Sequence, residues 1–238
     1  MIRIGTSGWS YDHWQGRFYP EQLSAEKRLE HYCRFFSTAE INNSFYNLPS
    51  EKTLRAWYET APDDFIFAAK ASRFITHMKK LKDPEDSTAK FFDRITALDD
   101  KLGPILFQLP PNWGVDVQRL ENLLEALPSE FRYGFEFRDT SWYDNEVYEL
   151  LEKYNAAFCI YDLEGHVSPK KITSDLIYIR LHGPDCAYQG SYDKQALSGW
   201  AGALSNWDSR DREIYCYFDN DQNGYAAQNA QQLSDMLK

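Results

Sequence analysis

The stretch Tyr133–Trp142, YGFEFRDTSW, decides the fold, because it has the pattern of a β-strand that ends in polar groups. Successive side chains of a strand point to opposite faces. The aromatic set is Tyr133, Phe135 and Phe137, and the opposite set is Gly134, Glu136 and Arg138. One face therefore suits packing under a helix, and the other ends in a carboxylate and a guanidinium that can contribute to a site.

Composition places the chain among single-domain globular proteins. It has 238 residues, 43% of them hydrophobic, and no linker rich in Pro, Gly or Ser divides residues 1–238. Lys plus Arg number 26 and Asp plus Glu 36, so the net charge of −10 disfavours non-specific binding to duplex DNA. The four cysteines lack CxxC spacing, and no signal peptide or apolar run of membrane-spanning length occurs. We expect a reduced, cytoplasmic protein without a membrane partner.

Eight strand patterns alternate with helix patterns at about 30 residues per unit. The expected strands are Ile2–Ser7, Thr38–Asn43, Phe65–Ala71, Ile105–Leu109, the stretch from Tyr133, Ala157–Asp162, Leu176–His182 and Glu213–Phe218. This alternation requires parallel strands with crossover helices, and eight units fit an α/β fold with a single, somewhat irregular (β/α)8 TIM barrel. A doubly wound open sheet is the alternative, although no GxGxxG or GxxxxGK[ST] motif supports a nucleotide-binding version.

The connecting segments carry their own signals. A helix is expected at Ala25–Phe36, and Ser50 is expected to cap the next one. Gly103 and Pro104 are expected to end a later helix. Ser72–Ser87 is expected to be a long polar loop, and the sequence leaves open whether it is a mobile lid.

Polar side chains gather at the carboxyl ends of the expected strands, where barrel enzymes carry their sites. Alternation places Glu40 with Asn42, Glu136 with Arg138, and Arg180 with His182. We predict catalytic acid/base roles for Glu136, His182 and Glu40. The predicted ligand-binding residues are Lys70, Arg138, Arg180, Asn42, Tyr46, Gln108, Asp162, Asn220, Trp9 and Trp142, of which the cations would hold an anion and the aromatic rim would stack on a ligand.

A purely structural lattice of ion pairs is the alternative to a site, since the carboxylates and cations of this set nearly balance. Buried ion pairs cost desolvation and often stabilise no better than apolar packing, which favours a ligand site. Lys70 offers further chemistry as a Schiff base with a carbonyl substrate, although pairing with a carboxylate is the simpler expectation. Only His182, with His77, maps to the strand ends, so no metal site is predicted, a carboxylate-bound divalent ion stays open, and no organic cofactor is implied.

Six motifs occur in order over essentially the whole chain. They are IGTSGWSY (Ile4–Tyr11), AEINNSFY (Ala39–Tyr46), FQLPP (Phe107–Pro111), FEFRDTSW (Phe135–Trp142), IRLHG (Ile179–Gly183) and YFDND…GYAAQNA (Tyr217–Ala230). This set resembles the YecE-like family, also catalogued as domain of unknown function 72. The resemblance implies a TIM barrel and brings no assigned activity. One departure is Asp219, which stands where the family's FNN motif has an asparagine.

The leading hypothesis is an enzyme that acts by general acid/base chemistry on a small anionic or polyhydroxylated molecule, sugar phosphate-like or nucleotide-like. The first alternative is a nucleic-acid-binding or repair-type barrel resembling endonuclease IV-like folds, in which cations hold phosphates and aromatics stack on bases. The second is a non-catalytic ligand-binding barrel. Substrate, reaction type and oligomeric state are left open by the sequence.

Overall fold

The computed structural model describes residues 1–238 and shows an α/β fold built on parallel strands. The strands are β1 (Ile2–Thr6), β2 (Thr38–Ile41), β3 (Ile66–Lys70), β4 (Leu102–Gln108), β5 (Tyr133–Glu136), β6 (Ala157–Phe158), β7 (Ile160–Leu163), β8 (His166–Val167), β9 (Leu176–Leu181) and β10 (Glu213–Phe218). They form two five-stranded sheets, ordered β1-β10-β9-β7-β8 and β2-β3-β4-β5-β6. Every pairing is parallel except that of β7 with β8.

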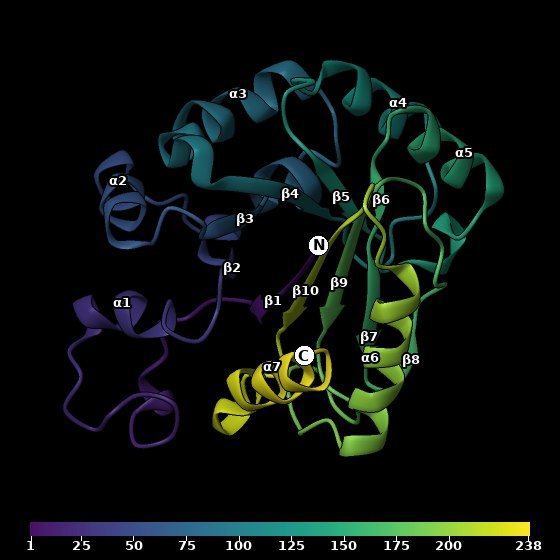
Figure 1. Cartoon of the computed structure of the whole chain (residues 1–238). Coiled ribbons are helices and arrows are strands. Elements are labelled where there is room, and N and C mark those ends of the chain that lie inside the picture. Colours follow the sequence, from purple (N-terminus) through teal and green to yellow (C-terminus); the bar gives the residue numbers. More distant parts are fainter.

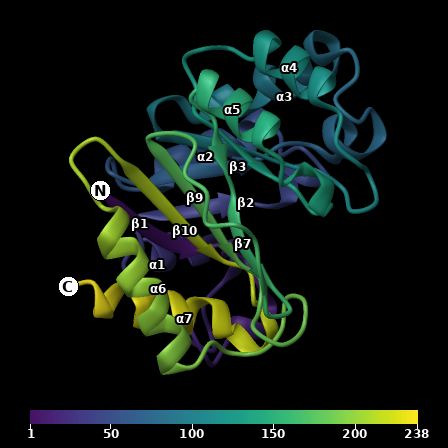
Figure 2. The ribbon, with the colours of Figure 1, turned by 90° about the vertical axis from the view of Figure 1, so that its right-hand side faces the viewer.

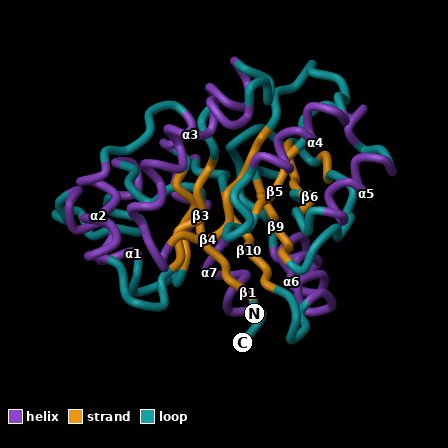
Figure 3. The backbone as a smooth tube through the Cα atoms, turned by 90° about the horizontal axis from the view of Figure 1, so that it is seen from above, coloured by secondary structure: helices purple, strands orange, loops and turns teal.

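Helices cover the outside of both sheets (Figure 1). They are α1 (Arg28–Tyr32), α2 (Glu51–Thr60), α3 (Pro84–Ile95), α4 (Val117–Ala126), α5 (Asn145–Lys153), α6 (Lys194–Trp207) and α7 (Tyr225–Met236). Figure 2 shows α6 and α7 together on one side of the strands and α3, α4 and α5 on the other. Seen from above, the strands occupy the middle and the helices surround them (Figure 3).

The hydrogen-bonded ladder is interrupted at two places, so the strands form two sheets where the sequence predicts one closed ring. Between β1 and β2 the ladder is reduced to the bridge of Ser7 with Glu40, beside a hydrogen bond of 2.8 Å from the Gly8 amide to the Glu40 carbonyl. The second interruption is at Cys159, which separates β6 from β7 in one continuous segment. β6 pairs with β5, whereas β7 pairs with β9.

Both faces of the central strands are buried, which gives the molecule two separate apolar clusters. The outer cluster has 55 residues, and it includes the aromatic set that begins with Tyr133. The inner cluster consists of Ala68, Leu106, Ala157, Cys159, Leu176, Tyr178, Tyr215 and Tyr217. Gly134 belongs to the inner face, where a Cβ would lie 3.4 Å from Tyr178. The alternation predicted for the stretch from Tyr133 is therefore confirmed, and the glycine leaves room for the tyrosine.

Several local predictions are confirmed and others are wrong. The eighth expected strand has its predicted bounds, and the Ser50 side chain caps α2 by accepting a hydrogen bond of 3.1 Å from the Thr53 amide. The long helix expected at Ala25–Phe36 is a 3₁₀ turn followed by the short α1. The loop expected at Ser72–Ser87 contains a π-helical turn, η4 (Phe74–Met78), and the start of α3.

The helical segment ends at Lys101, just before Gly103 and Pro104, but both residues lie inside β4, which begins earlier than the expected strand. A Cβ on Gly103 would lie 2.3 Å from the Ile66 side chain, so glycine allows the two strands to approach. The register between β3 and β4 shifts between Phe67 and Ala69, opposite Pro104. A bulge at this point accommodates a residue that has no amide hydrogen to donate.

The closest approach of β1 to β2 depends on Gly5, and this leads to a test. A Cβ on Gly5 would lie 2.2 Å from the Thr38 carbonyl oxygen, so Gly5→Ala should lower the free energy of unfolding by about 1–3 kcal/mol. Urea denaturation measures the change. The control is Gly202→Ala on α6, where a Cβ meets nothing within 4 Å and the better helix former should stabilise by up to about 1 kcal/mol. Equal effects of the two variants would contradict the close approach.

Candidate functional site

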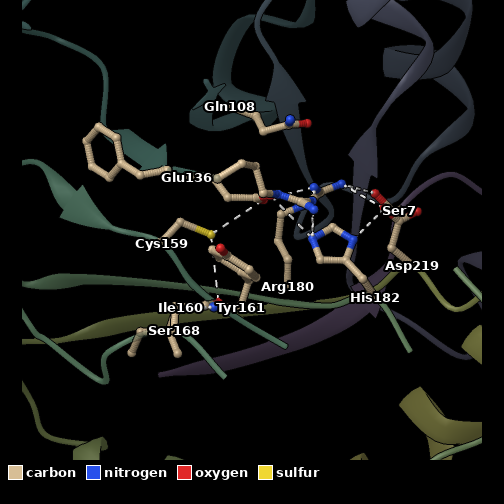
Figure 4. Close-up of polar contacts among 12 residues, drawn as sticks. Ser7, Gln108, Glu136, Cys159, Ile160, Tyr161, Ser168, Arg180, His182 and Asp219 are labelled. Carbon is tan, nitrogen blue, oxygen red and sulfur yellow. Dashed lines mark hydrogen bonds and ion pairs between the residues drawn. The ribbon is translucent and has the colours of Figure 1, made fainter. Parts of the chain in front are cut away.

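Six ionisable side chains converge inside the carboxyl ends of the strands, and we refer to them as the charged cluster. Figure 4 shows Arg180, His182 and Asp219 of this cluster pointing toward one another. They are Glu40 on β2, Glu136 on β5, Arg138 beyond β5, Arg180 on β9, His182 beyond β9 and Asp219 beyond β10. All six side chains are buried. They lie on the inner face because the intervening residues, such as Phe135 and Ile179, belong to the outer apolar cluster.

Arg180 is the centre of the charged cluster and is fully buried. Its Nη2 donates to Glu40 at 2.7 Å and to Asp219 at 3.1 Å, and its Nη1 donates to Glu136 at 2.9 Å. Burial alone would lower the pKa of Arg180, but the three carboxylates outweigh it and raise that pKa well above its ordinary value. Because both terminal nitrogens donate to protein carboxylates, Arg180 is placed to position other residues. The sequence analysis predicted instead that Arg180 contacts a ligand.

His182 is held between Asp219 and Arg138. Its Nδ1 lies 3.0 Å from an Asp219 oxygen, and its Nε2 lies 2.9 Å from Arg138 Nη2. Because an arginine can only donate, Nε2 accepts and Nδ1 carries the proton that is donated to Asp219. Burial would raise the pKa of Asp219, but Arg180 and His182 outweigh it and lower that pKa, so the aspartate is an anionic partner for the imidazole. This arrangement fixes one tautomer of His182.

Glu136 is fully buried and saturated with partners. One carboxylate oxygen accepts from Arg138 and the other accepts from Arg180. Burial would raise the pKa of Glu136, but Arg138, Arg180 and His182 together hold it well below its ordinary range. A carboxylate with such a low pKa is a weak base and is unprotonated at neutral pH. The geometry therefore favours a positioning role for Glu136 over the acid/base role predicted from the sequence.

Glu40 is equally well occupied. It accepts from Arg180, from the Ser7 hydroxyl, and at 2.7 Å from the Tyr178 hydroxyl. Ser7 and Asp219 are members of this network that the sequence-based site prediction omitted. Alternation offered a signal for Asp219, because it continues the inner series of Tyr215 and Tyr217 on β10.

Lys70 differs from the other cations of the site. It lies at the carboxyl end of β3, is 6% exposed, and its ammonium group makes no hydrogen bond or ion pair within the protein. The nitrogen lies 4.3 Å from the centre of the Phe45 ring. Burial first, and then the charge of Arg180, lower the pKa of Lys70 to about 8. The carboxylate partner expected from the sequence is absent, so the amine is available to a ligand.

A pocket of about 460 Å³ opens beside the charged cluster. Its walls include Gln108, Arg138, Tyr161, His166 and Tyr188. The Arg138 guanidinium lies 4.9 Å from the centre of the Tyr161 ring, and its Nη1 makes no hydrogen bond within the protein. Gln108 and Arg138 are therefore placed where the sequence predicted ligand-binding residues.

Other predicted ligand-binding residues lie outside the charged cluster. Asp162 alternates with Tyr161 and has Ile160 on its own face, in the outer apolar cluster, so it points away from the interior. Burial raises the pKa of Asp162, and its Oδ1 has no hydrogen-bond partner. Asn220 donates to the Gly190 carbonyl and to the Asn229 side chain, which makes it a link between a loop and α7.

The remaining residues of that prediction pack elsewhere. β2 ends at Ile41, so Asn42 leaves the face of Glu40 and lines a different pocket with Trp9, whose ring packs on Trp57. Trp142 is fully buried, and its indole donates to the Trp113 carbonyl at 2.7 Å. Tyr46 is 67% exposed on the rim.

Two whole-chain observations bear on the class of protein. No group of three or more His, Cys, Asp or Glu side chains has an arrangement that could hold a metal ion. The seven α-helices all lack the length or the apolar character that a membrane crossing requires.

Comparison with known proteins assigns this chain to a family. The family model described as "Protein of unknown function DUF72" matches residues 3–238. The UPF0759 protein YunF of Bacillus subtilis is 26% identical over 270 residues, covering the whole chain and 95% of YunF. The UPF0759 protein YecE of Escherichia coli K12 is 33% identical over 144 residues, covering 60% of the chain and 50% of YecE.

Solved structures agree with this assignment. A DUF72 family protein of Thermotoga maritima, TM1631, has a TM-score of 0.90 at 30% identity and covers 100% of this chain and 99% of its own. A DUF72 family protein of Enterococcus faecalis, EF0366, has a TM-score of 0.86 at 20% identity, covering 100% and 95%. The family resemblance predicted from the motifs is confirmed, and the chain belongs to the DUF72 family of proteins of unknown function.

Proposed function

We propose that this protein is an enzyme that binds a small anionic or polyhydroxylated molecule, sugar phosphate-like or nucleotide-like, at the carboxyl ends of its strands. The observation that carries the proposal is the contrast between saturated and free cations. Both terminal nitrogens of Arg180 are paired with carboxylates, whereas the Lys70 ammonium and Arg138 Nη1 have no protein partner. Cations buried without partners are costly, and an anionic ligand would offset that cost.

The same proposal includes the architecture around the ligand. We propose that the two sheets are the halves of one irregular (β/α)8 barrel, and that residues 1–238 are a single domain. The bridge of Ser7 with Glu40 and the continuous segment through Cys159 support the closure. The inner apolar cluster, which draws on β3, β4, β6, β9 and β10, has the composition of a filled barrel interior.

In the proposed site the ligand contacts come from three adjacent strands. Lys70 ends β3, Gln108 ends β4 and Arg138 follows β5, all on the inner face. An arginine offers a fork of donors that suits a phosphate or carboxylate, and a glutamine side chain can donate to and accept from hydroxyl groups. Tyr46 and Tyr188 on the rim provide aromatic surface for a sugar ring.

His182 is the residue we propose for proton transfer. Asp219 fixes its tautomer, so Nε2 is the nitrogen with the free electron pair, and Arg138 is the group that covers it. A ligand anion that draws Arg138 toward the pocket would uncover Nε2. Glu136 and Glu40 then act by holding Arg180 in place.

The nucleic-acid alternative is ranked second. It draws on exposed Tyr46, which has the Arg73 guanidinium 6.0 Å from its ring centre and could stack on a base. The net charge of −10 opposes it, and steep salt dependence of oligonucleotide binding would support it. A non-catalytic binding role would be shown by ligand binding without any product. A reducing, cytoplasmic location is proposed from the four unpaired cysteines.

The first prediction concerns anion binding. Phosphate, sulfate and sugar phosphates should raise the melting temperature, since a ligand at about 100 times its dissociation constant adds about 2.7 kcal/mol of stability. Lys70→Met should remove the shift because it removes a free cation. The matched control is Lys101→Met, another buried lysine, whose ammonium donates to the Tyr58 and Ala61 carbonyls at 2.7 Å.

Differential scanning fluorimetry is the measurement, with chloride held constant throughout. The control variant should melt earlier and still respond to the anions. A shift with oligonucleotides alone would support the nucleic-acid alternative, and the absence of any shift would overturn the anion site.

The second prediction concerns stability and pH. Because burial lowers the pKa of Lys70 to about 8, the unfolded chain binds more protons than the folded chain at this residue between pH 8 and the ordinary lysine value of about 10.5. Stability from this residue therefore rises across that window. Lys70→Met should raise the free energy of unfolding by about 1–3 kcal/mol at pH 7, and by less at pH 10. Urea denaturation at both values checks this, and destabilisation at pH 7 would mean that Lys70 is a structural partner of the carboxylates.

A further inference from the structure

Lys70 is a buried amine without a partner at the open end of a strand. Its nitrogen packs on the Phe45 ring and accepts or donates no hydrogen bond within the protein. Lys101 provides the contrast, because it is equally buried but is tied to two backbone carbonyls. Burial of a lysine for stability normally comes with partners of this kind. The unpartnered amine of Lys70 therefore needs another explanation.

Burial and the charge of Arg180 favour the unprotonated form of Lys70, and three carboxylates partly oppose them. The ionisable groups that interact electrostatically with Lys70 are Arg180 on β9, Glu136 on β5, Glu40 on β2, Asp219 beyond β10 and His77 on η4. Burial, and then Arg180, lower the pKa of Lys70 to about 8 against the partial opposition of the carboxylates. Roughly a tenth of the amine is then unprotonated at pH 7, about 300-fold more than for an ordinary lysine.

We propose that Lys70 is a nucleophile that forms an imine with the carbonyl group of the ligand. This inference rests on the proposed function, since the carbonyl compound would occupy the same site. The unprotonated nitrogen attacks the carbonyl carbon, and the carbonyl electron pair moves to oxygen and takes a proton. The nitrogen then gives up its protons, the hydroxyl group leaves as water, and the C=N bond forms. Amine and carbonyl thus give imine and water without any oxidant or reductant.

His77 is placed to take part in the proton transfers. Burial, followed by the charges of Lys70, Arg73 and Arg138, lowers the pKa of His77 to about 4, so its imidazole is unprotonated at neutral pH. Its ring lies 4.9 Å from that of Phe45, the ring on which Lys70 packs. An unprotonated imidazole that shares the Phe45 ring as a neighbour with the amine can accept a proton as the carbinolamine loses water.

Arg138 and Gln108 remain available for the rest of the molecule. Once Lys70 is bonded to carbon, the free Nη1 of Arg138 and the Gln108 side chain still line the pocket beside the charged cluster. These groups suit a carboxylate or phosphate next to the carbonyl group. The ligand class is therefore a small aldehyde or ketone that also carries an anionic group.

Reductive trapping of glyoxylate tests the proposal, because this probe combines an aldehyde with a carboxylate. The whole protein is incubated with glyoxylate and cyanoborohydride at pH 7, and peptide mass spectrometry follows the adduct on each lysine. Lys70 should be modified at least about tenfold faster than the exposed lysines, with a half-maximal rate near pH 8. Inorganic phosphate should slow modification at Lys70 alone.

Two controls make the outcome decisive. Lys101, buried but hydrogen-bonded, should stay unmodified in the same sample. Lys70→Arg keeps the positive charge but cannot form an imine, so it should keep the anion-induced thermal shift and lose the adduct. Modification of exposed lysines ahead of Lys70 would overturn the nucleophile even where phosphate still stabilises the protein. A Lys70 adduct without any anion-induced shift would keep the nucleophile and remove the anion site.

Discussion

The guanidinium of Arg180 and its three carboxylates are the interaction on which the interior depends. Arg180 comes from the sheet that contains β9, whereas Glu40 and Glu136 come from the other sheet. One buried cation thus links the two sheets at the end where the ladder between β1 and β2 is reduced to a bridge. Loss of one partner from a buried ion pair costs about 3–5 kcal/mol, and here several carboxylates share the same partner. The position of Asp219, and through it the tautomer of His182, follows from this link.

The site divides its cations into two kinds. Arg180 donates to the protein's own carboxylates. The Lys70 ammonium and Arg138 Nη1 have no hydrogen-bond partner within the protein. Groups of the second kind lower stability and are retained where function requires them. YunF, TM1631 and EF0366 match the full chain in sequence or fold, and the DUF72 family to which the chain belongs is one of unknown function. The chemistry of the site is therefore argued from the unpaired groups of this chain.

Alternation along strands predicted much of the site, because it fixes the face on which a side chain lies. It placed Glu40, Lys70, Glu136, Arg138, Arg180 and His182 inside. It was not applied to Asp162, although Phe158 and Ile160 show that this carboxylate belongs outside. The prediction that Asn42 shares the face of Glu40 is wrong for another reason, because β2 ends at Ile41. Alternation gives a face but no partner, so it could not show that Arg180 is saturated and Lys70 free. Nor could it reveal the interruption at Cys159, which depends on which neighbours the strand meets.

The order of strands in the two sheets sets the order in which the chain can assemble. Strands β2 to β6 are consecutive, so their sheet needs only residues 38–158. The other sheet brings β1 next to β10, more than 200 residues away, and pairings of such separation carry a large loop-closure cost. During synthesis, Glu40 and Glu136 emerge before Arg180, the cation that they share. Until β9 arrives, Glu136 has Arg138 as its only cationic partner of this network and Glu40 has none. The final ion pairs therefore mark the completion of folding, because they form only after nearly the whole chain has been made.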